Sequence, residues 1–250
     1  MSGHSKWATT KYRKGAQDKA RAKLFAKLIR QVEVASREGG GDLESNASLK
    51  AAVAKARDSS VPSDTIERAI KRGTGELEGV RYEAVSYEGY GPNGVAIIVE
   101  CLTDNRNRTG SEIRTIFSRN GGSMAEPGAV NWQFERKGVV TFQSSLKEEE
   151  LLGIILDFSA EDLVFEGENW KVTCEPSDLN TLKIGIEEAK LKIISTEFAM
   201  VPSQIISIGK ESEIRKILKI IDSLEDNDDV QNVYDNADFD ESVLNSIDEL

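Results

Sequence analysis

The hydrophobic pattern of this 250-residue chain changes near Gly79, and this change sets the main limit on its fold. Before Gly79, apolar residues recur about every three to four positions, which is typical of helices with one buried face. After Gly79 they alternate in short runs, as in strands with one buried side, and helical runs separate these strands. The pattern therefore predicts an α+β protein whose helical part comes first.

The first part of the chain predicts a bundle of three short helices. Over residues 16–37, apolar side chains occupy one side of a helix and cations occupy the opposite side. A second helix is expected over residues 47–58. A third helix is expected to begin with Ser63 or Asp64 as its cap and to end with Gly73 in the left-handed conformation.

The rest of the chain predicts two sheet domains. Residues 138–200 give the order strand, helix, strand, strand, helix, strand, which is the ferredoxin-like unit. A further strand, helix and strand follow, and we expect them to complete the sheet begun before residue 134, where "AVNWQF" is a predicted strand. The expected domains are residues 1–79 for the basic arm and helical bundle, 80–136 with 203–238 for a discontinuous middle α/β domain, 137–202 for an inserted ferredoxin-like domain, and 239–250 for a frayed acidic tail.

No catalytic, metal or cofactor site is expected. The stretch "GYGPNG" has the spacing of a dinucleotide-binding loop, but a strand follows it where a helix is required, so it predicts a hairpin turn. His4 is the single histidine, and no partner for a catalytic triad or a zinc site is evident. Cys101 and Cys174 lie in apolar runs and are expected to be buried, reduced thiols. We therefore predict a non-enzymatic protein with no small-molecule substrate.

Charge is distributed unevenly along the chain, whose formal net charge is −11. Residues 1–80 carry 16 Lys or Arg and 10 Asp or Glu, a net charge of +6, whereas residues 81–250 carry −17. This asymmetry predicts a basic module that contacts a polyanion and an acidic body that does not. The chain has no long apolar run, so we expect no membrane span, no secretion and a cytoplasmic location.

The basic N-terminal region is the first candidate for contact with nucleic acid. We expect residues 1–15 to form a flexible arm. In the helix that follows, cations at i, i+4 and i+8 repel one another, and we expect no compensation for this within the folded chain. A polyphosphate would compensate for this repulsion. An aromatic ring of the arm that stacks on an unpaired base would add about 1–3 kcal/mol of binding free energy. The predicted contacts are Lys6, Trp7, Lys11, Tyr12, Arg13, Lys14, Lys19, Lys23, Lys27 and Arg30.

The alternatives for this region are a solvated amphipathic helix with a disordered arm, or an anionic membrane surface. A second candidate contact is the polar loop at residues 104–109, which lies between a buried strand and the start of a helix. Its side chains suit phosphate or RNA edges, and the predicted contacts are Asn105, Arg106 and Arg108. An equally good interpretation is a capping turn whose Arg side chains pair with nearby acids.

Long blocks of the sequence are also distinctive as motifs. They include "GHSKW", "KGAQDKARAKLFAKLIR", "GGGD", "IERAIKRGTGELEGV", "YEGYGPNGVAIIVECLTDNRNRT" and "FSRNGG" with "FERKGVV". Together they closely resemble the YebC/PmpR family, which also includes the mitochondrial translational activator of cytochrome c oxidase. The resemblance extends over about residues 2–142 and continues more loosely to about residue 235.

The resemblance implies a helical N-terminal domain, a middle domain built from two chain segments, and a ferredoxin-like domain inserted between those segments. It also implies a role in gene expression without known catalysis. Its most specific motifs fall on residues 3–7 and 104–109. The chain departs from the usual pattern in "ATTKYRK", where "ANIKHRK" is common and Tyr12 replaces a histidine, and in "GSMAEPGAVNW", where "GNLGTDGSVAW" is typical.

We predict a nucleic-acid-binding regulator of gene expression, in one of two versions. In the first, it is a YebC-type transcriptional regulator that binds DNA through the basic arm and helix. In the second, it binds ribosomal RNA at the ribosome and eases translation of particular messages. The arm suits RNA crevices, and no helix with base-reading side chains stands out. A different class of function is that of a protein–protein adaptor that acts through the acidic domains.

Overall fold

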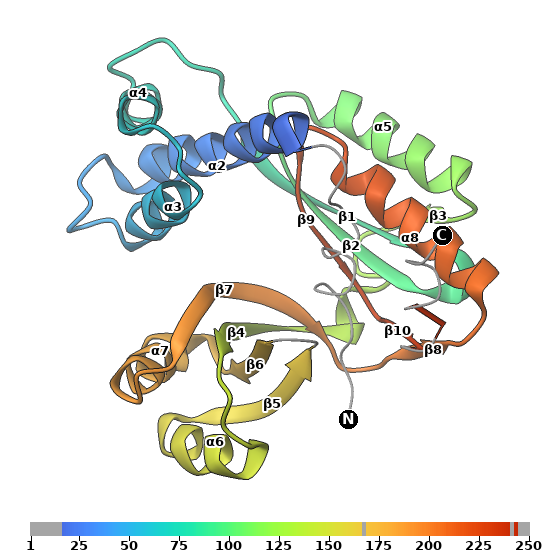
Figure 1. Ribbon diagram of the computed structural model, residues 1–250. Helices are drawn as coiled ribbons and strands as arrows, with labels where there is room; N and C mark the ends of the chain where they lie inside the picture. Colours follow the sequence, from blue (N-terminus) through green and yellow to red (C-terminus); the bar gives the residue numbers. More distant parts are fainter. Residues whose placement is uncertain (1–16, 167–168, 241–242, 245–250) are drawn as a thin grey trace.

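The computed structural model describes residues 17–166, 169–240 and 243–244. Within these residues the chain is of mixed helix and sheet type, with a helical N-terminal part and two separate four-stranded sheets (Figure 1). This confirms the predicted α+β fold with three domains. No helix in the described ranges is long and apolar enough to cross a membrane.

The helical part consists of three helices that bury one apolar face each. The helices are α2 (Gln17–Gly39), α3 (Ala47–Asp58) and α4 (Ser63–Thr74). In α2, Leu28 and Val32 are buried against residues of the other two helices, including Leu49, Val53 and Ile66. These positions recur at helical spacing, so the periodicity in the sequence correctly predicted which face is buried.

The ends of α4 differ from the prediction. Neither Ser63 nor Asp64 caps the helix, and no side chain makes a capping hydrogen bond there. Gly75, rather than Gly73, adopts the left-handed conformation after the helix, with φ of 83°. Gly73 is needed for another reason, because a Cβ atom at this position would lie 2.4 Å from the backbone oxygen of Glu33 in α2.

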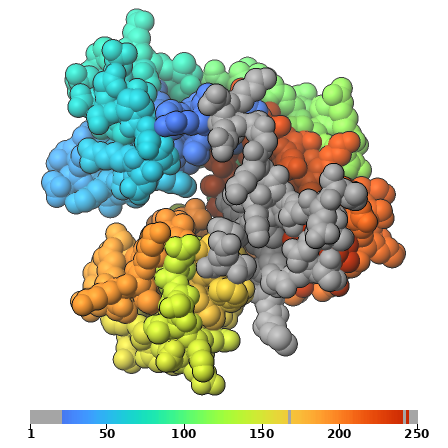
Figure 2. Space-filling view, in the orientation of Figure 1, coloured from blue at the N-terminus to red at the C-terminus, as the bar shows by residue number. Residues whose placement is uncertain are grey.

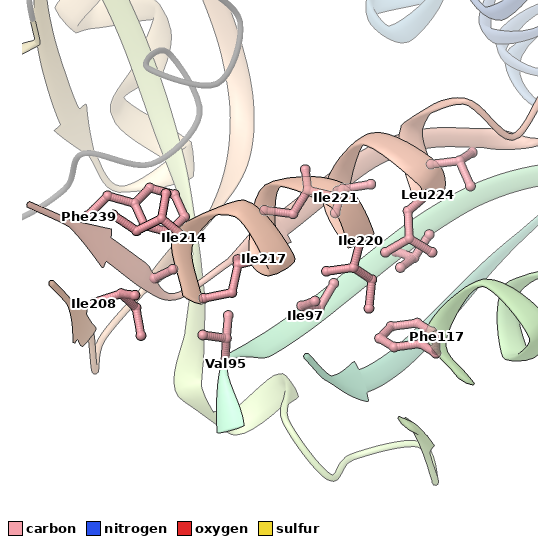
Figure 3. Close-up of a cluster of buried hydrophobic side chains, with 14 of the residues drawn as sticks. Val95, Ile97, Phe117, Ile208, Ile214, Ile217, Ile220, Ile221, Leu224 and Phe239 are labelled. Atoms are coloured by element: carbon pink, nitrogen blue, oxygen red, sulfur yellow. The ribbon is translucent and has the colours of Figure 1, made fainter. Parts of the chain in front are cut away.

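The middle domain is an antiparallel sheet with helices α5 (Arg106–Arg119) and α8 (Glu211–Glu225) on one face. Apolar side chains from both helices and from the central strand form its core (Figure 3). A short turn at Pro92–Gly94 joins the first two strands, so "GYGPNG" is the predicted hairpin turn. The strands are β1 (Glu83–Tyr90), β2 (Ala96–Thr103), β3 (Ser123–Ala125) and β9 (Val230–Asp235), in the order β3-β1-β2-β9.

The second sheet interrupts the middle domain and has the ferredoxin-like topology. Its strand order is β5-β6-β4-β7, and each neighbouring pair is antiparallel. Helices α6 (Glu148–Ile155) and α7 (Leu179–Glu188) contribute buried residues to its core, and α6 continues into a short 3-10 turn at Leu156–Phe158. The strands are β4 (Phe134–Gln143), β5 (Ala160–Glu166), β6 (Asn169–Cys174) and β7 (Lys192–Pro202).

The strand predicted at "AVNWQF", next to the junction of the two sheet domains, is wrong for most of its length. Asn131–Gln133 forms a 3-10 turn instead of the middle of a strand, and β4 runs without a break across the expected boundary at residues 136 and 137. The cause is Glu88, a buried carboxylate that accepts hydrogen bonds from the backbone N–H groups of Gly128, Val130 and Asn131 at 2.7–2.9 Å. These N–H groups are therefore unavailable for strand pairing.

The expected frayed tail is wrong for the residues that the structure describes beyond Ala237. Strand β10 (Ala237–Phe239) pairs in parallel with β8 (Ile206–Ile208). Phe239 is 2% exposed and Leu244 is 5% exposed, and both lie in the core of the middle domain. Two apolar side chains thus anchor a segment that the acidic composition predicted to be free.

The two cysteines are free and buried, which confirms their predicted role as small core residues. Burial raises the pKa of the Cys101 thiol to about 12, with a further contribution from the negative charge of Asp229. Burial likewise raises the pKa of the Cys174 thiol to about 11. Both thiols are therefore protonated near neutral pH and are poor nucleophiles.

Candidate nucleic-acid interface

Much of the predicted interface lies outside the residues that the structure describes. This applies to Lys6, Trp7, Lys11, Tyr12, Arg13 and Lys14, and to the side chain of Lys19 near the start of α2. The predicted contacts whose side chains are described are Lys23, Lys27, Arg30, Asn105, Arg106 and Arg108.

Two lysines of α2 contact the C-terminal end of α8. The Lys23 ammonium donates to the backbone oxygen of Asp226 at 2.9 Å and pairs with the carboxylate of the same residue at 3.1 Å. The Lys27 ammonium donates to the backbone oxygen of Glu225 at 2.8 Å. The last carbonyl groups of a helix lack partners within it and lie at the negative end of its dipole, so these two lysines cap α8.

Arg30 continues this contact one turn further along α2. One nitrogen of its guanidinium donates to the backbone oxygen of Asp228 at 2.7 Å and pairs with the carboxylate of Asp229 at 2.8 Å. The guanidinium also lies over the ring of Tyr82, 5.0 Å from its centre. Only 19% of the Arg30 side chain is exposed, compared with 40% of the Lys23 side chain.

These contacts change the interpretation of the basic face. The expectation that the folded chain gains nothing from these cations is wrong, because the acidic 225–229 segment ("EDNDD") at the end of α8 offsets their mutual repulsion. The 225–229 segment lies about 200 positions downstream of α2. Whether the same cations also contact nucleic acid stays a prediction.

The 104–109 loop forms the capping turn that was one of its two interpretations. Asn105 caps α5 by accepting a hydrogen bond from the backbone N–H of Arg108 at 3.1 Å. The guanidinium of Arg108 pairs with Asp104 at 2.9 Å and with Asp229 at 2.7 Å. Arg106 is more open, with 61% of its side chain exposed and its nearest carboxylate, that of Glu83, 3.8 Å away.

Asp229 is the residue that connects the two predicted contact regions. Its side chain is 5% exposed, and it accepts a hydrogen bond from the Thr109 hydroxyl at 2.6 Å in addition to its pairs with Arg30 and Arg108. The structure thus places the basic face of α2 directly beside the 104–109 loop. The sequence did not identify Asp229, because it stands among several acids in "SLEDNDDV" that were interpreted as a solvated face.

The environment of Asp229 favours its charged form. Burial by itself would raise the pKa of this carboxyl, but hydrogen bonds from Thr109 and Arg108 and the charges of Arg108 and Arg30 outweigh burial. The net effect is a pKa below the usual value of 3.8. Asp229 is therefore ionised near neutral pH, and it neutralises part of the positive charge that the two regions bring together.

A cavity of about 470 Å³ lies where the three domains meet. Figure 2 shows the molecule hollowed between the helical part and the ferredoxin-like part. The wall includes side chains of strands β4, β5, β6, β7 and β9. The Lys55 ammonium of α3 pairs with the Glu197 carboxylate of β7 at 3.7 Å. Among the lining residues are Lys27, Lys55, Thr141, Lys171, Glu197 and Tyr234. The lining includes five acidic residues and three lysines, so acids outnumber cations on this wall.

A metal site is not evident in the described residues, in which no three His, Cys, Asp or Glu side chains cluster as ligands. The basic and polar groups at the junction of α2, α5 and α8 can form ion pairs and hydrogen bonds with phosphate. The described residues there include no histidine or reactive thiol that would serve as an acid, base or nucleophile.

Comparison with known proteins identifies the family. Residues 5–76 match the TACO1/YebC protein N-terminal domain, and residues 82–237 match the TACO1/YebC second and third domain. A probable transcriptional regulatory protein of Renibacterium salmoninarum is 50% identical over the full length of both chains. A protein of the same name from Halothermothrix orenii is 47% identical over the full length of both chains.

A solved structure supports the same assignment. The crystal structure of a conserved hypothetical protein from Aquifex aeolicus is 40% identical and superimposes with a TM-score of 0.83. The match covers 91% of this chain and 94% of the other. The resemblance in the sequence motifs is thus confirmed along nearly the whole chain, and the protein belongs to the TACO1/YebC family.

Proposed function

We propose that this protein is a non-enzymatic regulator of gene expression that binds nucleic acid. The basic arm would supply most of the phosphate contacts, and the exposed cations beside Asp229 would supply a second set. The observation that supports this best is the position of α2 beside the 104–109 loop, which groups cations from two distant parts of the chain. Lys23, Arg106 and Arg108 each keep 40–61% of their side chains exposed, so a phosphate can reach them.

The names of the relatives favour DNA as the ligand, since they are probable transcriptional regulatory proteins. The geometry of α2 favours RNA. A recognition helix must present one face to the major groove, and the cationic face of α2 is turned toward the end of α8. A basic arm with aromatic residues can instead enter irregular RNA without a groove-reading helix. We therefore keep binding to ribosomal RNA at the ribosome as the second candidate.

The proposal is tested by fluorescence anisotropy with duplex DNA and with a structured fragment of ribosomal RNA. Affinity should fall with rising salt, with a log–log slope of about −0.9 per phosphate contact for duplex DNA and about −0.7 for single strands. The double variant Lys11→Met/Lys14→Met should bind more weakly and show a shallower slope. Its matched control is Lys147→Met/Lys192→Met, which removes the same charge from the ferredoxin-like domain and should bind like the unaltered protein.

Crosslinking in cells, followed by sequencing of the bound nucleic acid, distinguishes the two ligands. Enrichment of promoter DNA supports the transcriptional version, and enrichment of ribosomal RNA supports the translational one. Binding that does not depend on salt, or equal binding by the arm variant and its control, would remove the basic region from the mechanism. A protein–protein adaptor acting through the acidic domains would then be the better explanation.

A further inference from the structure

The 225–229 segment accepts hydrogen bonds from the same α2 cations that would contact nucleic acid. It presents carboxylates and the free carbonyl groups of a helix end, and both are good acceptors for Lys and Arg. Lys23, Lys27 and Arg30, three successive cations of one helix face, each donate to this segment. Its acceptor groups thus take the places that phosphate oxygens would occupy in a complex.

The contact is open at one end and closed at the other. At the outer end, the side chains of Lys23 and Asp226 are 40% and 80% exposed, so water and solutes reach this pair. At the inner end, the side chains of Arg30 and Asp229 are 19% and 5% exposed. An exposed ion pair is weak and exchanges readily, so a phosphate can displace Asp226 from Lys23 before the inner contact changes.

The acidic side of the contact remains satisfied when α2 leaves. Without Arg30, Asp229 still accepts from Arg108 at 2.7 Å and from Thr109 at 2.6 Å, and both belong to its own domain. On the α2 side, Lys23, Lys27 and Arg30 each donate to the 225–229 segment, and separation would break these hydrogen bonds. Separation therefore keeps the partners of Asp229 in the middle domain and exposes the donor groups of these three cations to solvent.

We propose that the 225–229 segment competes with nucleic acid for the cations of α2. Nucleic acid can displace the exposed Asp226 from Lys23 in the closed molecule, but it gains the more enclosed Arg30 only when the helical domain moves away from the end of α8. This inference rests on the proposed function, because it assigns a regulatory contact to the same basic face.

The first test compares two double variants that each remove two negative charges. Asp226→Asn/Asp228→Asn weakens the competing segment, whereas Glu149→Gln/Asp157→Asn neutralises exposed acids at α6 in the ferredoxin-like domain. For a single-stranded RNA probe, the first variant should bind about two- to fivefold more tightly, as expected for the loss of an exposed competing pair. Its salt slope should steepen by about 0.7 for each cation released, and the control should change neither quantity.

The second test crosslinks α2 to β9, so that the helical domain cannot move away from the end of α8. The Gln31 and Gln231 side chains are hydrogen-bonded across the α2–β9 junction at 3.2 Å. Both residues are replaced by cysteine, and a short bismaleimide joins the two new thiols. The native thiols of Cys101 and Cys174 should remain unmodified, because they are buried and their pKa values are raised. The linked protein should bind the RNA more weakly and with a shallower slope than the same protein capped with N-ethylmaleimide.

The outcomes separate this inference from the proposed function. If the unaltered protein binds neither DNA nor RNA, the proposed function fails and this inference fails with it. If the unaltered protein binds, but linked and capped proteins bind alike, only the inference fails. It also fails if the Asp226→Asn/Asp228→Asn variant loses stability in urea without binding more tightly, because the segment would then be only a structural partner of α2.

Discussion

Replacing Asp229 with asparagine should destabilise the protein, because this carboxylate joins three elements. It pairs with Arg30 of α2 at 2.8 Å and with Arg108 of α5 at 2.7 Å, and it accepts from Thr109. Breaking a fully buried ion pair by removing one partner costs about 3–5 kcal/mol. The two arginine side chains are 19% and 45% exposed, so water partly solvates them in the variant, and we expect a loss of about 2–3 kcal/mol.

The loss should depend on pH in a defined direction. The pKa of Asp229 is lower in the folded protein than its usual value of 3.8, so its stabilising effect is fully present above that value. The effect disappears as the pH falls through the lower pKa of the folded state. The difference in unfolding free energy between the unaltered protein and Asp229→Asn should therefore be constant from about pH 5 to 8 and should shrink below about pH 4.

Urea unfolding followed by circular dichroism measures this difference. With an m-value of about 3 kcal/mol/M, the expected loss lowers the midpoint by about 0.7–1 M. Asp226→Asn is the matched control, because it removes the same charge from a side chain that is 80% exposed, and it should change stability by less than about 0.5 kcal/mol. Equal effects of the two substitutions, or a difference that does not change below pH 4, would refute the reasoning.

Other predictions concern residues away from this junction. Glu88→Gln should cost about 1–3 kcal/mol in urea unfolding, because an amide cannot accept all three backbone N–H groups that the carboxylate accepts. Gly73→Ala should lower stability by about 1–3 kcal/mol because its Cβ atom meets α2, whereas Gly153→Ala, with open space in helix α6, should raise it by about 0.5–1 kcal/mol. Cys101 and Cys174 should not react with a thiol-specific disulfide reagent at pH 8 until urea unfolds the chain.

The parts of the fold that were predicted correctly are those whose pattern repeats over two or more turns or several strand positions. Helix α3 has the predicted bounds, and the strand and helix order of the ferredoxin-like unit matches. The strand predicted around Ile206–Ile208 is present, but it pairs with Ala237–Phe239 instead of joining the middle sheet, which only β9 completes. The strands Ser123–Ala125 and Ala237–Phe239 were not predicted, and each is only three residues long. Three residues are too few for an alternating pattern to be distinguished from a turn.

The errors at element ends have a different origin, since they depend on contacts between distant residues. Glu88 removes backbone donors some 40 positions away, and this determines where β4 begins. Gly73 was predicted to end a helix, because glycine is common just after helix ends. In the structure, glycine is required at this position because the backbone of α2 leaves no room for a Cβ atom. In both cases the local sequence is compatible with two structures, and a tertiary contact decides between them.

The candidate site shows the same limit. The helical spacing correctly predicted that Lys23, Lys27 and Arg30 share one helix face. The repulsion among these cations requires negative charge nearby, but it does not show whether that charge comes from nucleic acid or from a segment of the same chain. The 225–229 segment meets that requirement within the molecule. Cations on one helix face therefore support nucleic-acid binding only to the extent that they remain exposed.

The occupied face of α2 limits what the closed molecule can bind. Residues 1–16 contain four Lys or Arg and no Asp or Glu, so the arm can make about four phosphate contacts and give a salt slope of about −3 with single strands. A slope clearly steeper than this would require cations of α2 or of the 104–109 loop in addition. Deleting residues 1–16 should therefore abolish most binding by the closed, crosslinked protein, but only part of the binding by the unlinked protein. If deletion weakens both forms by the same factor, the α2 cations do not contribute in either state.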